Sequence, residues 1–91
     1  MSDVIRRRVI VHGRVHGVFF RDSTRERAQS HGVAGWARNV PDGSVEAVLE
    51  GEPEAVERMV RFLQTGPPHA DVEGVEVQEE EPEGLEGFSV R

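Results

Sequence analysis

The sequence predicts an α+β fold of the ferredoxin-like class, a sandwich in which one antiparallel sheet carries two helices on a single face. Three observations support this prediction. Segments with strand and helix periodicity follow one another in the order β-α-β-β-α-β. A strong turn signal joins the two middle strands, and a short extra strand closes the chain. Because this fold hosts enzymes, RNA-binding proteins, metal carriers and regulatory domains, it does not define a function by itself.

The first half of the fold is predicted from residues 4–32. Residues 4–12 alternate in a pattern typical of a strand, and a glycine-bearing loop over residues 13–21 follows. Residues 22–31 are predicted as the first helix, because Phe20, Thr24 and Ala28 share one stripe and Gly32 is suited to the residue after a helix.

The second half begins with a hairpin. Residues 33–40 and 45–50 are predicted as strands, since Pro41-Asp42-Gly43-Ser44 between them is a turn sequence. The second helix is predicted to start at Pro53, a residue favoured at the first helical position. Its core stripe has apolar residues at i, i+3, i+4 and i+7, namely Val56, Met59, Val60 and Leu63.

The chain closes with two more strands. Residues 72–78 are predicted as a fourth strand in which Gly74 marks a bulge. Residues 79–86 are predicted as a solvated acidic loop, and residues 88–91 as a short terminal strand. With 91 residues, the chain can build one core and not two, so we expect a single domain over residues 1–91.

Composition excludes several classes of function. The absence of cysteine excludes a disulfide scaffold, a thiolate metal site and a cysteine nucleophile. No apolar run approaches the ~20 residues that cross a bilayer, and the first residues are not typical of a signal peptide. We therefore expect a cytoplasmic protein with no membrane partner.

The distribution of charge favours a small anionic ligand over nucleic acid. A net charge of −6 argues against non-specific binding of nucleic acid. Residues 1–45, however, contain eight Arg and four acidic residues, whereas residues 46–91 contain three Arg and thirteen acidic residues. The first half is therefore suited to attracting a small anion.

The loop over residues 13–21 is the candidate anion site. A glycine-bearing turn from a strand into a helix directs backbone N–H groups toward one point, where the helix N-terminus adds partial positive charge. Arg21 supplies a charged, forked donor that suits phosphoryl oxygens. The alternative at this point is an ordinary turn whose glycines serve only the backbone geometry.

Other chemistries are poorly supported. His12 and His16 lie on a strand end and a loop without further ligands, so we expect no metal site. Ser23 and Thr24 have no evident His-Asp support for a covalent intermediate. The attacking group in any reaction would be water, and Asn39 is the candidate to hold it. The alternative for Asn39 is a turn residue.

The combination Gly-x-Val-His-Gly-Val-x-Phe-Arg (13–21) with Gly-Trp-x-x-Asn-x-x-x-Gly-x-Val (35–45) resembles the acylphosphatase family. The resemblance covers nearly the whole chain, including the closing Phe88-x-Val90-Arg91. It implies hydrolysis of the carboxyl–phosphate bond of acyl phosphates without a metal or cofactor. It also implies that Arg21 and the loop amides hold the phosphoryl group while Asn39 orients the water. The loop amides concerned are those of Val15, His16, Gly17, Val18, Phe19 and Phe20. Family members often carry Gln in place of His16, where the implied role is mainly a backbone N–H.

The expected partners follow from this resemblance. The substrate would be a small acyl phosphate, and inorganic phosphate would be both product and competing ligand, for a monomeric enzyme without nucleic acid. A carboxylate, whose conjugate acid has a pKa of roughly 4, leaves without help from a general acid. The site is therefore expected to act on mixed anhydrides rather than on stable monoesters. Two alternatives are a non-catalytic phosphate or phospho-ligand binding module of the same fold and a regulatory domain of a larger maturation protein.

Overall fold

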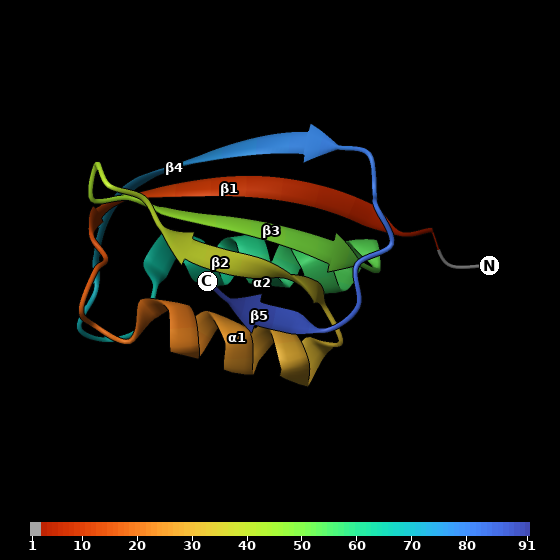
Figure 1. Cartoon of the computed structure of the whole chain (residues 1–91), viewed down its shortest axis with the longest axis horizontal. Helices are drawn as coiled ribbons and strands as arrows, with labels where there is room; N and C mark the ends of the chain where they lie inside the picture. Colours follow the sequence, from red (N-terminus) through yellow and green to blue (C-terminus); the bar gives the residue numbers. More distant parts are fainter. Residues whose placement is uncertain (1–2) are drawn as a thin grey trace.

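Five strands form one sheet, and both helices cover the same face of it (Figure 1). The structure is a computed structural model that describes residues 3–91. The elements in chain order are β1 (Ile5–Arg14), α1 (Phe20–His31), β2 (Ala34–Asn39), β3 (Val45–Gly51), α2 (Pro53–Thr65), β4 (Asp71–Glu80) and β5 (Phe88–Val90). None of the helices in this part of the chain is long and apolar enough to cross a membrane.

The strand order is β4-β1-β3-β2-β5, which confirms the predicted β-α-β-β-α-β arrangement with an added terminal strand. The first four strands pair antiparallel, as predicted. The terminal strand differs, because β5 pairs parallel with β2, with Gly35 opposite Phe88 and Ala37 opposite Val90. The loop before β5 crosses from one edge of the sheet to the other, so β5 enters in the same direction as β2 and the whole sheet is mixed (Figure 1).

Two boundaries near the predicted anion loop differ from the sequence prediction. Helix α1 begins at Phe20 rather than Asp22, so Arg21 lies in its first turn. Strand β1 continues past His12 to Arg14 by pairing with β4. The register between these two strands shifts where Gly13 follows His12, opposite the segment around Gly74. The predicted irregularity at Gly74 is therefore confirmed, and it carries the chain into the loop.

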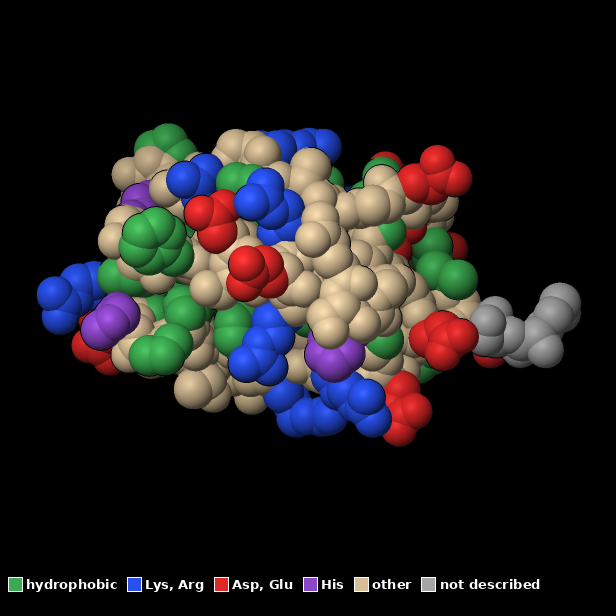
Figure 2. All heavy atoms as spheres, turned by 90° about the horizontal axis from the view of Figure 1, so that it is seen from below, with side chains coloured by type: hydrophobic (Ala, Val, Ile, Leu, Met, Phe, Trp, Pro, Cys, Tyr) green, Lys and Arg blue, Asp and Glu red, His purple; other side chains and the backbone are tan. Residues whose placement is uncertain are grey.

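The hydrophobic core lies between the helices and the sheet. The predicted stripe of α2 supplies Val56, Met59 and Leu63, which are buried, while Val60 packs partly against the core. Helix α1 contributes Phe20, Thr24 and Ala28. Its outer surface is polar, and Arg and acidic side chains are interspersed over this side of the molecule (Figure 2).

The opposite face of the sheet carries a network of arginine and glutamate side chains. Glu46 contacts Arg8 and Arg38, and Glu80 contacts Arg6 and Arg8. Burial alone would raise the pKa of Glu46, but hydrogen bonds from Arg38 and Arg8 outweigh this effect and lower it. These ion pairs connect β1, β2, β3 and β4 across the face that the helices leave uncovered.

Glu50 extends this network to the loop that leads into β5. Its carboxylate accepts a hydrogen bond from Arg6 at 2.6 Å and backbone hydrogen bonds from Glu83, Gly84 and Leu85 at 2.9, 3.1 and 3.0 Å. Burial would raise the pKa of Glu50, but the backbone N–H of Glu83 and the Arg6 guanidinium, with the other two N–H groups, lower it. Glu50 therefore fixes the start of the path by which the chain reaches β5.

Candidate active site

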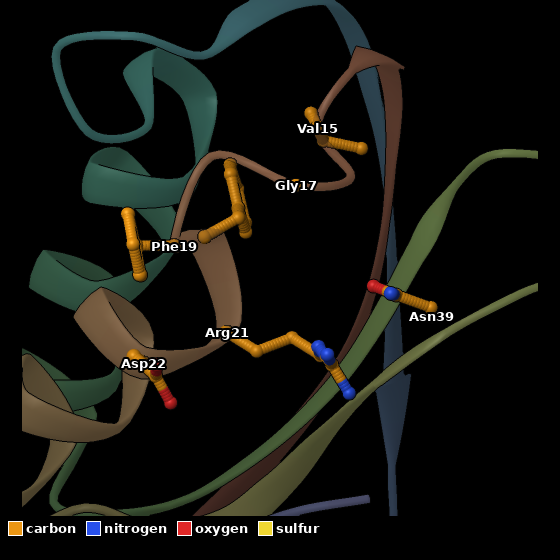
Figure 3. Close-up of a pocket in the computed structure, with 7 residues that line it drawn as sticks. Val15, Gly17, Phe19, Arg21, Asp22 and Asn39 are labelled. Carbon is orange, nitrogen blue, oxygen red and sulfur yellow. The ribbon is translucent and has the colours of Figure 1, made fainter.

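A pocket of about 260 Å³ lies between the loop after β1, the first turn of α1 and the end of β2 (Figure 3). Its lining residues are Val15, Gly17, Phe19, Phe20, Arg21, Asp22 and Asn39. The structure thus brings Asn39 to the loop and Arg21, which the sequence analysis selected separately. His16 and Val18 do not line the pocket. The His16 ring contacts Ser44 and Val18 packs partly against the core. The part predicted for these two residues concerns mainly their backbone N–H groups.

The entry into the loop requires a glycine. Gly13 has a φ of +121°, and a Cβ at this position would lie 2.1 Å from the backbone oxygen of Asp71. A side chain there would force β1 and β4 apart, so Gly13 allows the two strands to stay paired until the loop begins.

Two further residues of the loop adopt a left-handed conformation. Gly17 has a φ of +71°, and Phe19, just before α1, has a φ of 58° and a ψ of 28°. A non-glycine residue in this region costs about 1–3 kcal/mol, and such strain concentrates at functional sites. The Phe19 side chain is 77% exposed, so burial of its ring does not offset the cost.

The start of α1 provides free backbone donors. The first N–H groups of a helix have no intrahelical partner, and Phe19 provides no side-chain cap for them. The first backbone hydrogen bond of the helix runs from the N–H of Ser23 to the Phe19 oxygen at 2.9 Å. The amides just before Ser23 therefore border the pocket at the positive end of the helix, where an anion is stabilised.

Arg21 extends from α1 across the pocket toward Asn39 (Figure 3). Its Nη1 donates a hydrogen bond to the backbone oxygen of Arg91 at 2.7 Å, and the N–H of Arg91 donates to the Ala37 oxygen at 2.9 Å. Within residues 3–91, no Asp or Glu side chain lies within ion-pair distance of Arg21. The guanidinium is thus held in place by the Arg91 oxygen and pairs with no acidic side chain in the described part of the chain.

Asn39 is the last residue of β2 and pairs with Val45 of β3. Its Oδ1 is buried and has no hydrogen-bond partner in the described part of the chain. The amide lies on the side of the pocket that faces Arg21 (Figure 3). The turn itself is stabilised by Asp42, whose Oδ1 accepts hydrogen bonds from the N–H and Oγ of Ser44 at 2.9 and 2.6 Å. Asn39 therefore lies in the pocket, whereas Asp42 and Ser44 make the side-chain hydrogen bonds of the turn.

Asp22 lines the pocket, although the sequence analysis noted no role for it in the site. Its carboxylate is exposed and lies 3.5 Å from the guanidinium of Arg25. No cluster of three or more His, Asp or Glu residues suited to a metal ion occurs within residues 3–91. His12, considered above as a metal ligand, contacts Glu76 at 2.5 Å.

Two contacts that shape the site could not be predicted from the sequence. One is the hydrogen bond from Arg21 to Arg91, and the other is the hydrogen bond between His16 and Ser44. Both join segments far apart in the chain, and neither leaves a local pattern in the sequence.

Comparisons with known proteins give one consistent result. A family model described as Acylphosphatase matches residues 7–90. An acylphosphatase of Rubrobacter xylanophilus is 66% identical over 85 residues, which cover 92% of this chain and 77% of the relative. One from Gloeobacter violaceus is 54% identical, with 99% of this chain and 97% of the relative covered. A solved acylphosphatase from Coxiella burnetii is similar with a TM-score of 0.94 at 37% identity, covering 98% of this chain and 94% of that one.

Proposed function

This chain belongs to the acylphosphatase family and is a hydrolase of acyl phosphates, and from that premise we propose how its pocket performs the reaction. The phosphoryl group binds against the loop amides from Val15 to Phe20 and the Arg21 guanidinium. Asn39 holds the attacking water. The free donors at the start of α1 and the position of Arg21 in the pocket, where it pairs with no described Asp or Glu side chain, support the first assignment.

The observation that carries the proposal is the buried Oδ1 of Asn39, which has no partner in the described part of the chain and borders the same pocket as Arg21. An unpaired buried acceptor costs about 1–3 kcal/mol, so it favours a ligand that donates a hydrogen. A water molecule that donates one hydrogen to Oδ1 keeps a lone pair of its oxygen free for attack on phosphorus.

The reaction needs few chemical groups because its leaving group is stable. The water oxygen bonds to phosphorus while the bond from phosphorus to the carboxyl oxygen breaks, and the electron pair departs on the carboxylate. The protons of the water end on phosphate and in solvent. Positive charge and fixed donors stabilise the negative charge of the transferring phosphoryl group, and this stabilisation is the main source of catalysis in such transfers.

The same reasoning limits the substrates. An alcohol leaving group needs a proton from a general acid, whereas a carboxylate does not. We therefore propose that the enzyme hydrolyses mixed anhydrides and leaves alkyl phosphates intact, without a metal or cofactor. Inorganic phosphate should compete with the substrate. We further propose that residues 1–91 form one acylphosphatase-like domain that acts as a cytoplasmic monomer, independent of nucleic acid and membranes.

One assay tests these points. Phosphate release is measured from benzoyl phosphate and from a simple alkyl phosphate, each in the presence of a chelator. We expect turnover of the first and none of the second. Efficient hydrolysis of the alkyl phosphate would contradict the leaving-group argument. Tight phosphate binding without any turnover would favour the binding module, which the comparisons do not favour.

A further inference from the structure

We propose that His16 is a positioning residue that sets the distance between the phosphate loop and Asn39. The inference rests on the roles proposed above for the loop and for Asn39. It concerns the side chain of His16, whereas the family resemblance implies mainly a role for its backbone N–H.

The two halves of the pocket belong to different parts of the sheet. Pairing of β1 with β3 ends at Val11 opposite Val45, and beyond this point β1 pairs only with β4. The loop therefore leaves the sheet on the side of β4, whereas Asn39 stands at the end of β2, on the other side of β3. The backbone ladder does not join the loop to the strand end that carries Asn39.

The His16 side chain makes this connection. Its Nε2 lies 2.7 Å from the backbone oxygen of Ser44. Within the described chain, this is the only hydrogen bond between loop residues 15–19 and turn residues 40–44. Because a carbonyl oxygen can only accept, Nε2 carries the hydrogen and donates this hydrogen bond.

The carbonyl that His16 binds is directly coupled to Asn39. The same Ser44 oxygen accepts the N–H of Val40 at 2.8 Å, and Val40 follows Asn39 in the chain. Ser44 is itself buried and is fixed by two hydrogen bonds to Asp42. A shift of the loop relative to Ser44 would therefore change the distance from the bound phosphoryl group to the water on Asn39.

Such a change affects attack more than binding. The loop amides and Arg21 bind the phosphoryl group on one side of the pocket, whereas attack requires the water at the correct distance from it. A misplacement of about 1 Å can slow a reaction by as much as 10²-fold. His16 therefore supports kcat while contributing little to phosphate affinity.

The test compares three substitutions of His16. His16→Ala and His16→Leu remove the donor, and the leucine fills a similar volume, so that it provides the test if the alanine variant folds poorly. His16→Gln keeps an amide N–H at nearly the same reach. For each variant, kcat and KM are measured with benzoyl phosphate, and the inhibition constant is measured with inorganic phosphate.

We expect the alanine and leucine variants to lose about 10-fold in kcat, with a phosphate inhibition constant within about 2-fold of the original. The glutamine variant should retain most of kcat. A kcat within about 2-fold of the original in both donor-free variants would overturn the inference. An inhibition constant that rises as much as kcat falls would also overturn it, because His16 would then only support the loop.

A double-mutant cycle with Asn39→Ala separates this inference from the proposed function. If His16 acts through the water on Asn39, His16→Ala should slow the Asn39→Ala enzyme by much less than 10-fold. If the kcat losses of the two single variants instead multiply in the double variant, the role of His16 is wrong, while the proposed role of Asn39 still stands. Full turnover by Asn39→Ala itself would overturn the proposed role of Asn39, and the inference with it.

Discussion

Replacing Glu50 with alanine should destabilise the protein strongly, although Glu50 lies outside the pocket. The Glu50 side chain is 2% exposed and forms an ion pair with Arg6, which is 4% exposed. The substitution would leave the buried guanidinium without its closest carboxylate and would release three backbone N–H groups of the loop before β5.

The size of the effect follows from what remains around Arg6. Removing one partner of a buried ion pair costs about 3–5 kcal/mol. Arg6 keeps Glu80 at 2.8 Å and Glu83 at 3.6 Å, and the released N–H groups belong to a loop that water can reach. We therefore expect a loss near the lower limit, about 3 kcal/mol. For a domain of this size the melting temperature should fall by about 12–24 °C.

Thermal unfolding by circular dichroism at neutral pH measures this loss. Glu79→Ala is the matched control, because Glu79 contacts Arg7 while its side chain is 81% exposed, and its melting temperature should change by less than about 3 °C. The difference in melting temperature between the original protein and Glu50→Ala should become smaller in acid. The pKa of Glu50 is lowered in the folded state, so its contribution is complete above its unfolded value of 4.5 and is lost as pH falls through the folded pKa. A Glu50→Ala protein as stable as the control would refute this account of the buried network.

Three further predictions concern the loop, the arginine and acid stability. Gly13→Ala should lower the melting temperature by at least about 10 °C, because its Cβ would lie 2.1 Å from the Asp71 oxygen, whereas Gly74→Ala meets open space and should change it little. Arg21→Gln should reduce kcat/KM for benzoyl phosphate by about 10²-fold or more and weaken inhibition by phosphate. Arg61→Gln on the exposed side of α2 serves as its control. An Arg21→Gln enzyme as active as Arg61→Gln would contradict the role of Arg21. Hydrogen bonds from Arg8 and Arg6 lower the pKa of Glu80 from 4.5 to about 2. The free energy of unfolding should therefore decrease as the pH is lowered from 4.5 to about 2. Calorimetry should show that the stability of Glu80→Gln depends less on pH in this range. A pH dependence equal to that of the original protein would argue against this assignment.

The sequence predicted those features that leave local patterns. The Pro41-Asp42-Gly43-Ser44 turn and the apolar stripe of α2 determined the hairpin and the second helix, and the structure has both. The start of α1 was predicted two residues late, because Phe19 begins the helix in a left-handed conformation without a capping side chain. Helix signals in sequence rely on such capping residues.

Long-range contacts could not be predicted in the same way. The parallel pairing of β5 with β2 depends on where the acidic loop crosses the sheet, and Glu50 fixes that loop from a distant strand. Of the site, the sequence predicted Arg21 and Asn39 as residue types suited to phosphoryl transfer. The hydrogen bonds that hold Arg21 at Arg91 and His16 at Ser44 join residues 70 and 28 positions apart, and they became visible only in the folded chain.

The most direct test of the central claim is the kinetics of Asn39→Ala with benzoyl phosphate, with Gln64→Ala on the exposed side of α2 as the matched control. If Asn39 orients the water, kcat should fall by about 10²-fold, while the phosphate inhibition constant stays within about 3-fold of the original. The loop amides and Arg21 would still bind the phosphoryl group in this variant. An Asn39→Ala enzyme whose kcat matches that of the control would contradict the account.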